Sequence, residues 1–217
     1  AGTQAAGDRE DFGTMSKPFH AGRSSQSGLL AANLASKGFT SATNIFEGRR
    51  GFFDVLAPEY DLDILTDKLG SKWEIFQNGL KPYACGVVNH PLIDAMIKFK
   101  NENQFNINNI KGIKAYVHHL VPELVGHKQH PTIGLEGKFS FHHSMAVGLL
   151  HGRATPLEYT DTIVKDTDVE KLRNIIQCEI REDFNEEQAI VEITYKDNTV
   201  TVVEIESCSG SPENPLT

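Results

Sequence analysis

The chain has 217 residues, which is enough for one large domain or for two small ones with their own hydrophobic cores. Apolar residues make up 39% and charged residues 23%, a composition typical of a soluble globular protein. The formal net charge of −8 argues against a nucleic acid or a membrane surface as the partner. A site for an anionic ligand must therefore be a local basic pocket.

The cysteines indicate the cellular compartment of the protein, and the first residues of the chain indicate whether the sequence is complete. Cys85, Cys178 and Cys208 are widely spaced and form no CxxC pair, which indicates neither a disulfide framework nor a structural zinc site. We therefore expect a reducing compartment, the cytoplasm or the mitochondrial matrix. No apolar run approaches the length of a transmembrane helix. Because the chain begins with Ala1 and not with methionine, we expect a piece of a longer protein.

The first candidate site lies in the stretch 13–28, GTMSKPFHAGRSSQSG. The pattern predicts a helix over Ala21–Lys37, with Lys17 and His20 just before it. Helix N-termini carry unpaired N–H groups and partial positive charge, so a lysine and a histidine there favour a carboxylate or a phosphate. The alternative is a solvated lysine with a packing or capping histidine. The small residues of this helix predict burial between other helices.

The second candidate site lies between Leu80 and Ile97. Pro91 suits the first turn of a helix, Asn89 or His90 suits its cap, and residues 92, 96 and 99 form an apolar stripe. Here again a lysine, Lys81, lies in the loop before a helix. Cys85 and His90 also suggest a thiol nucleophile with its base, but a small buried cysteine and a capping histidine are favoured.

The remaining chain predicts strands mixed with helices. Alternation at Ile113, Ala115 and Val117 indicates a strand, and residues 189–195 and 199–205 indicate a hairpin. Helices are expected over 139–150, 156–164 and 168–178, the last capped by Thr167 or Asp168. We considered a metal site among four loop histidines, but they lack the HExxH spacing, so we favour polar surface. These histidines are His118, His119, His127 and His130.

These patterns predict an α+β protein. Residues 1–75 are expected to be the latter part of an all-helical domain. Residues 76–205 are expected to form a smaller α/β domain with a mainly antiparallel sheet, and residues 206–217 to connect back toward the helical domain.

Four ordered motifs resemble the MmgE/PrpD family, which contains 2-methylcitrate dehydratases, cis-aconitate decarboxylases and an iminodisuccinate epimerase. The motifs are GTMSKPFHAG (13–22), KPYAC with HPLIDA (81–85 and 90–95), LLHG (149–152) and GSPENPL (210–216). The resemblance implies a large helical domain, a smaller α/β domain, an active site in the cleft between them and a homodimer. It also implies that no metal, iron–sulfur cluster or organic cofactor is used.

The resemblance further implies which residues contact the substrate. Reactions of this family pass through enolate-like or carbanion-like species, which need cationic partners and a proton carrier. Lys17 and Lys81 are therefore the expected catalytic residues, each binding a substrate carboxylate. His20 would support Lys17 or the substrate, and Cys85 would line the cavity. His143 stands where many relatives have a tyrosine, and it would still donate a hydrogen bond to the substrate.

The expected function is a cofactor-independent lyase on a small tri- or dicarboxylate, most simply the dehydration of 2-methylcitrate. The alternatives are decarboxylation of cis-aconitate to itaconate and a non-catalytic member of the same fold. Because the family's remaining site residues precede this stretch, residues 1–217 alone are expected to be inactive.

Overall fold

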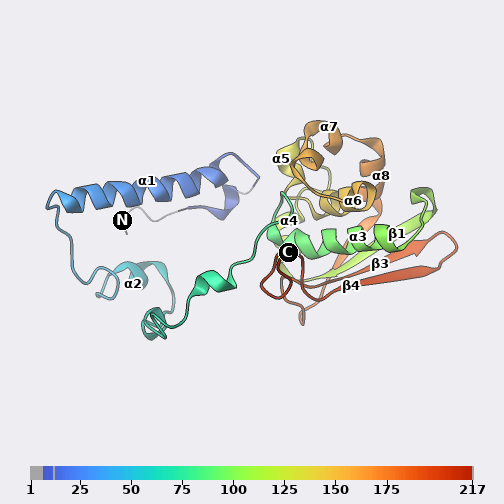
Figure 1. Ribbon diagram of the computed structural model, residues 1–217. Coiled ribbons are helices and arrows are strands. Elements are labelled where there is room, and N and C mark those ends of the chain that lie inside the picture. Colours follow the sequence, from blue (N-terminus) through green and yellow to red (C-terminus); the bar gives the residue numbers. More distant parts are fainter. Residues whose placement is uncertain (1–6, 12, 217) are drawn as a thin grey trace. The chain divides into compact units, whose positions relative to one another are not determined.

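The computed structural model describes residues 7–11 and 13–216 (Figure 1). Residues 1–6, Phe12 and Thr217 lie outside the described residues, and with them the extreme ends of the first and last predicted segments. The chain divides into two compact units, residues 1–76 and 77–217, which we describe separately.

The N-terminal unit is built on one long helix, α1 (Ser16–Ser36), followed by the short helix α2 (Phe52–Leu56). The predicted helix is confirmed, but it begins at Ser16 and not at Ala21. Lys17 and His20, predicted to precede the helix, therefore lie inside its first turns. Pro18 explains the early start, because its fixed φ and missing N–H suit the first turn of a helix.

Where the structure describes it, the rest of this unit consists of turns, bends and short helical turns. Short 3₁₀ helices cover Arg9–Asp11, Asp63–Leu65 and Glu74–Gln77, the last of which ends on the first residue of the C-terminal unit. Phe53 contacts the rings of Phe46, Phe52 and Tyr60. Among the described residues of α1, only Ser27 is buried. The sequence predicts burial of this helix between other helices, and the described part of the unit does not bury it.

The C-terminal unit contains a four-stranded sheet in the order β2-β1-β3-β4. Its strands are β1 (Ile110–Val117), β2 (Ile176–Ile180), β3 (Ala189–Tyr195) and β4 (Val200–Ile205). β1 pairs with β2 in parallel and with β3 antiparallel, and β3 and β4 form the predicted hairpin. The prediction of an α+β fold with a mainly antiparallel sheet is confirmed.

The predicted helix over 168–178 is wrong at both ends. Helix α8 covers Thr167–Ile175, and strand β2 begins at the next residue. Two consecutive β-branched residues, Ile175 and Ile176, favour extended backbone, and pairing with β1 decides the conformation. The helix is capped by Asp166, whose carboxylate accepts from the N–H groups of residues 168 and 169, and not by Thr167 or Asp168.

Helices cover one side of the sheet (Figure 1). Helix α3 (His90–Glu102) packs against β3 and β4, α8 packs against β1, and α6 (Phe141–His151) packs against α3 and α8. The predicted stripe on α3 is confirmed, since Leu92, Met96 and Phe99 are all fully buried. The sheet is therefore apolar on its helix side, and the site elements rest on this core.

Shorter helices complete the unit. They are α4 (Leu120–Val125), α5 (Gly134–Gly137) and α7 (Asp161–Val164), with 3₁₀ turns η5 (Val87–Asn89), η6 (Ile107–Asn109) and η7 (Pro156–Tyr159). The single helix predicted over 156–164 is thus two pieces, because Thr160 is extended and caps the second piece with its hydroxyl.

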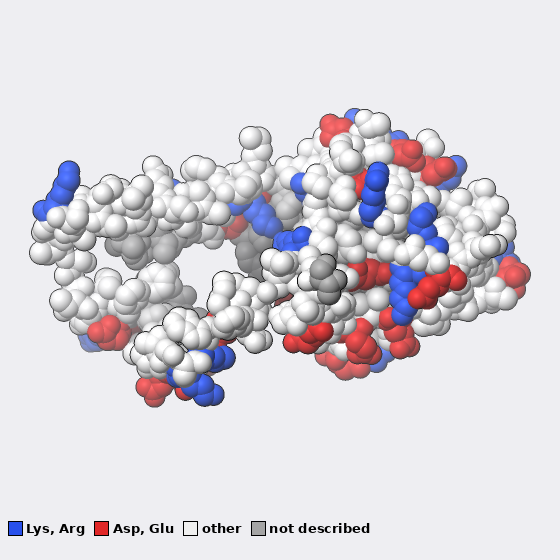
Figure 2. All heavy atoms as spheres, viewed as in Figure 1, with Lys and Arg blue, Asp and Glu red and all other residues white. Residues whose placement is uncertain are grey.

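Charge is mixed on the surface of this unit. Acidic and basic side chains are interspersed on the face drawn in Figure 2. Within residues 7–11 and 13–216, no helix is both long enough and apolar enough to cross a membrane.

Candidate active site

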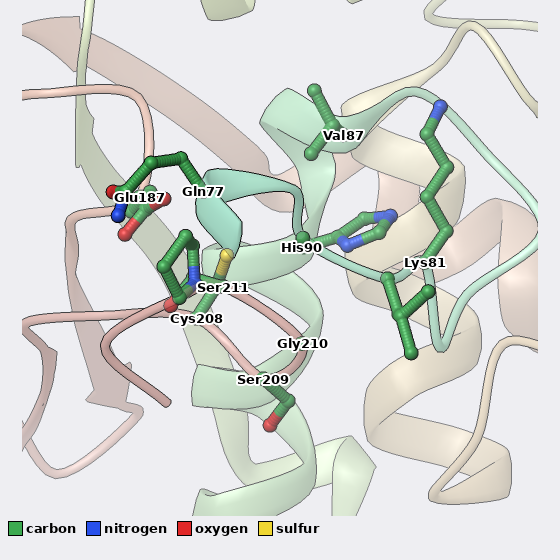
Figure 3. A pocket seen from close by; sticks show the side chains of 12 residues that line it. Gln77, Lys81, Val87, His90, Glu187, Cys208, Ser209, Gly210 and Ser211 are labelled. Atoms are coloured by element: carbon green, nitrogen blue, oxygen red, sulfur yellow. The ribbon is translucent and has the colours of Figure 1, made fainter. Parts of the chain in front are cut away.

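A cavity of about 280 Å³ opens in the C-terminal unit where the start of α3 meets the loop after β4 (Figure 3). Segments far apart in the sequence form its wall. These are Gln77, Gly79, Leu80 and Lys81 before η5, Val87 and His90 around the start of α3, Glu187 before β3, and residues 208–212 after β4. The predicted Lys81 loop therefore borders a cavity.

The backbone next to Lys81 is held by the loop after β4. The N–H of Leu80 donates to the carbonyl oxygen of Gly210 over 2.7 Å, and the Lys81 ammonium donates to the Cys85 carbonyl over 3.4 Å. Gly210 has a φ of 87°, and a Cβ there would lie 2.0 Å from the Leu80 oxygen. Only glycine combines that dihedral angle with so close an approach. The position of Lys81 thus depends on Gly210.

We expect Gly210→Ala to lower the free energy of unfolding of the C-terminal unit by about 2 kcal/mol or more, because both the backbone angle and the Cβ contact become strained. Urea unfolding of the two proteins measures the difference. Gly112→Ala on β1, in the same unit, is the matched control. A Cβ there comes no closer than 3.9 Å to its nearest neighbour, the Ile175 oxygen, and the entropic cost of a strand glycine predicts a gain of up to about 1 kcal/mol. Equal stability of Gly210→Ala and the parent protein would contradict this account of the loop.

Asp94 on α3 joins the lysine loop to the loop after β4. The Tyr83 hydroxyl donates to Asp94 Oδ1, and the N–H of Ser209 donates to Oδ2 over 2.6 Å. Burial, followed by the neighbouring carboxylate of Asp94, raises the pKa of Tyr83, which keeps its hydroxyl a donor. One carboxylate therefore holds two walls of the cavity together.

Lys17 and His20 belong to the N-terminal unit. Lys17 is half-buried in the first turn of α1, and the His20 Nε2 lies 3.2 Å from a carboxylate oxygen of Asp11. That carboxylate orients the histidine. The roles of both residues toward a substrate remain predictions.

Two family models match the chain. The MmgE/PrpD N-terminal domain matches residues 1–65, and the MmgE/PrpD C-terminal domain matches residues 83–217. The chain belongs to the MmgE/PrpD family. The resemblance read from the four motifs is confirmed, and membership of the family supports a lyase of the dehydratase or decarboxylase type. No curated protein matches the chain.

In this MmgE/PrpD chain, Cys85 is a buried thiol. Burial raises its pKa, and the polar side chains of Tyr159, Asn89 and Ser144 oppose that rise. A thiol with a raised pKa is protonated at neutral pH and is a poor nucleophile, which disfavours a Cys85–His90 nucleophile pair. Cys85 does not belong to the wall of the cavity described above. Its contact with a substrate remains a prediction.

His143 is fully buried on α6 and is not among the residues that line the cavity. Its Nε2–H donates to the Glu158 carbonyl over 2.9 Å, and its Nδ1 accepts from Arg173 at 3.5 Å. Burial, helped by the positive charge of Arg173, lowers the pKa of His143 to about 4, against the hydrogen bond to Glu158. The neutral imidazole uses both nitrogens inside the protein. Its predicted hydrogen bond to the substrate is untested.

The loop histidines flank α4, with His118 and His119 before it and His127 and His130 after it. The ring centroids of His118 and His119 are 4.1 Å apart, and the Nε2 atom of His127 lies 2.6 Å from the carbonyl oxygen of Glu123. Within the described part of the chain, no three histidine, cysteine or carboxylate side chains are grouped to hold a metal ion.

His90 was not among the predicted substrate-binding residues, because a helix cap was favoured over a pairing with Cys85. Asn89 does occupy the N-cap position of α3, but it has helical backbone angles and its side chain accepts no cap hydrogen bond, and His90 is the first residue of the helix. His90 instead lines the cavity beside Lys81. A histidine directly before a helix-initiating proline and within the lysine motif was the available signal.

Proposed function

We propose that the full-length protein is a cofactor-independent lyase that acts on a small tri- or dicarboxylate, most simply by dehydrating 2-methylcitrate. The observation that carries the proposal is the ammonium group of Lys81 at the wall of a cavity, where Glu187 supplies the other charged side chain among the lining residues. In a protein of net charge −8, an ammonium group at a cavity wall gives an anion a local partner. Family membership supports the lyase class.

Lys81 and Lys17 have defined tasks in this proposal. In a dehydration, a base removes the proton next to a carboxylate, and its electron pair moves into the carboxylate as an enolate-like species. That pair then forms the double bond while the hydroxyl group takes up a proton and leaves as water. Two ammonium groups bound to the substrate carboxylates would stabilise the growing negative charge. One of them would carry the proton if desolvation lowered its pKa.

The second candidate is the decarboxylation of cis-aconitate. Here the bond between carbon and a carboxyl group breaks, carbon dioxide leaves, and the electron pair remains as a carbanion that takes up a proton to give itaconate. The same two ammonium groups, of Lys17 and Lys81, would serve both reactions, because both reactions build negative charge next to a retained carboxylate.

Proton NMR of the full-length protein with each acid separates the candidates. We expect 2-methylcitrate to lose its signals as an unsaturated tricarboxylate appears. If 2-methylcitrate persists while cis-aconitate is converted into itaconate, the protein is a decarboxylase and not a dehydratase. If both acids persist and neither binds, the protein is a non-catalytic member of the fold.

A further inference from the structure

His90 is an unusual buried group in the C-terminal unit. Its side chain is 1% exposed, and its Nε2 has no hydrogen-bond partner among the residues that the structure describes. A buried polar atom without a partner costs free energy, so such atoms are rare unless a ligand or another group satisfies them. The residue also does not occupy the N-cap position of α3, which belongs to Asn89.

The position of the ring indicates where that partner comes from. His90 lines the same cavity as Lys81, and Figure 3 shows its ring extending from the start of α3 toward the Lys81 side chain. Tyr83 fixes the ring from another side by an edge-to-face contact with centroids 5.3 Å apart. Tyr83 is itself held by Asp94. The imidazole is therefore oriented before any ligand arrives, which reduces the entropy lost on binding.

The charge state of the ring suits a hydrogen-bonding role. Burial lowers the pKa of His90 to about 4, and the positive charge of Lys81 lowers it further in the same direction. At neutral pH the imidazole is uncharged and a weak base, which disfavours a role in proton abstraction. A neutral imidazole still donates one N–H, and next to an ammonium group its natural acceptor is an anion.

We propose that His90 contacts the substrate directly, with its Nε2–H donating to the same carboxylate that Lys81 binds. This inference rests on the proposed function of the Lys81 cavity. It adds a substrate-binding residue at the start of α3 and fixes the ligand there as a carboxylate held by one cation and one neutral donor.

The test uses propane-1,2,3-tricarboxylate, which has neither a hydroxyl group to lose nor a double bond. Calorimetric titration of the full-length protein with this acid is compared for the parent, His90→Leu and His90→Gln. We expect His90→Leu to weaken binding by about tenfold or more, because a hydrogen bond to a charged acceptor is lost. Glutamine keeps an N–H donor, so His90→Gln should recover most of the affinity. His119→Leu, an exposed histidine near α4, is the matched control and should bind as the parent does.

Stability separates this role from a structural one. Leucine replaces an unpartnered buried polar atom by an apolar group, so His90→Leu should be as stable as the parent or more stable, even though it binds worse. A loss of stability with unchanged affinity would overturn the inference and would assign His90 to packing.

Two further results keep the inference separate from the proposed function. If Lys81→Ala abolishes binding of the acid and His90→Leu does not weaken it, His90 is not a contact and the function stands. If the parent protein neither binds the acid nor consumes a candidate substrate, the function itself fails. Should His90→Leu not fold, ¹⁵N-histidine NMR of the parent decides. The His90 Nε2 resonance must shift when the acid is added, and an unchanged resonance would overturn the inference.

Discussion

Lys81→Ala is expected to lower kcat/KM of the full-length protein by at least about a hundredfold, the usual cost of removing one group that stabilises transition-state charge. Lys17→Ala should have a loss of similar size, because each ammonium group is assigned to a substrate carboxylate. The two losses should not add fully, since the residues act on one substrate. Steady-state kinetics on the acid that the protein consumes gives these numbers.

Two exposed lysines provide matched controls, one in each unit. Lys196→Ala, in the β3–β4 turn, and Lys37→Ala, at the end of α1, remove the same charge and should keep parent activity. Lys81→Arg then separates charge from proton transfer. Arginine holds the carboxylate but does not give up its proton at neutral pH. If Lys81→Arg binds the acid but does not convert it, Lys81 is the residue that transfers the proton. If Lys81→Ala keeps full activity, Lys81 is not part of the site.

The C-terminal unit is expected to lose most of its stability between pH 6.5 and pH 4. His90, His142 and His143 are at most 7% exposed, and burial lowers the pKa of each from 6.5 to about 4. The unfolded chain therefore binds protons that the folded chain does not, and stability falls as pH falls through this window. One pKa unit corresponds to about 1.4 kcal/mol, so each histidine costs about 2 kcal/mol at pH 5.

Urea unfolding at a series of pH values measures this loss. Three such histidines together cost about 6 kcal/mol at pH 5, which is comparable with the whole stability of an ordinary domain. His142→Gln should flatten the dependence by about a third, because it removes one of the three titrating groups. The exposed His119→Gln should keep the full dependence. A free energy of unfolding that stays constant from pH 7 to pH 5 would contradict the assignment of three neutral buried histidines.

Local sequence patterns were sufficient to predict the helices and strands whose conformation depends mainly on their own residues. Pro91 and the apolar stripe placed α3, and strict alternation placed β1 and the hairpin, because these patterns match the helix and strand periods directly. Strand β2 was missed for the opposite reason. Its residues continue a helical pattern, and only pairing with β1, more than sixty residues earlier in the chain, makes them extended.

The candidate site was predictable only in part. Lys81 was found through its motif, but the cavity beside it depends on contacts such as that of Asp94 with Ser209, 115 residues apart in sequence. No local pattern reports such a contact. His90 was misread for a related reason, since a histidine before Pro91 fits a cap equally well until its backbone angles and burial are known.

Lys17 and Lys81 are proposed, above all, to bind one and the same acid. A crystal structure of the full-length protein soaked with propane-1,2,3-tricarboxylate tests this most directly. We predict density for the acid with the Nζ atoms of Lys17 and Lys81 both within hydrogen-bonding distance of its carboxylates. Density for the acid elsewhere, or the two ammonium groups directed to solvent on different faces, would contradict the account.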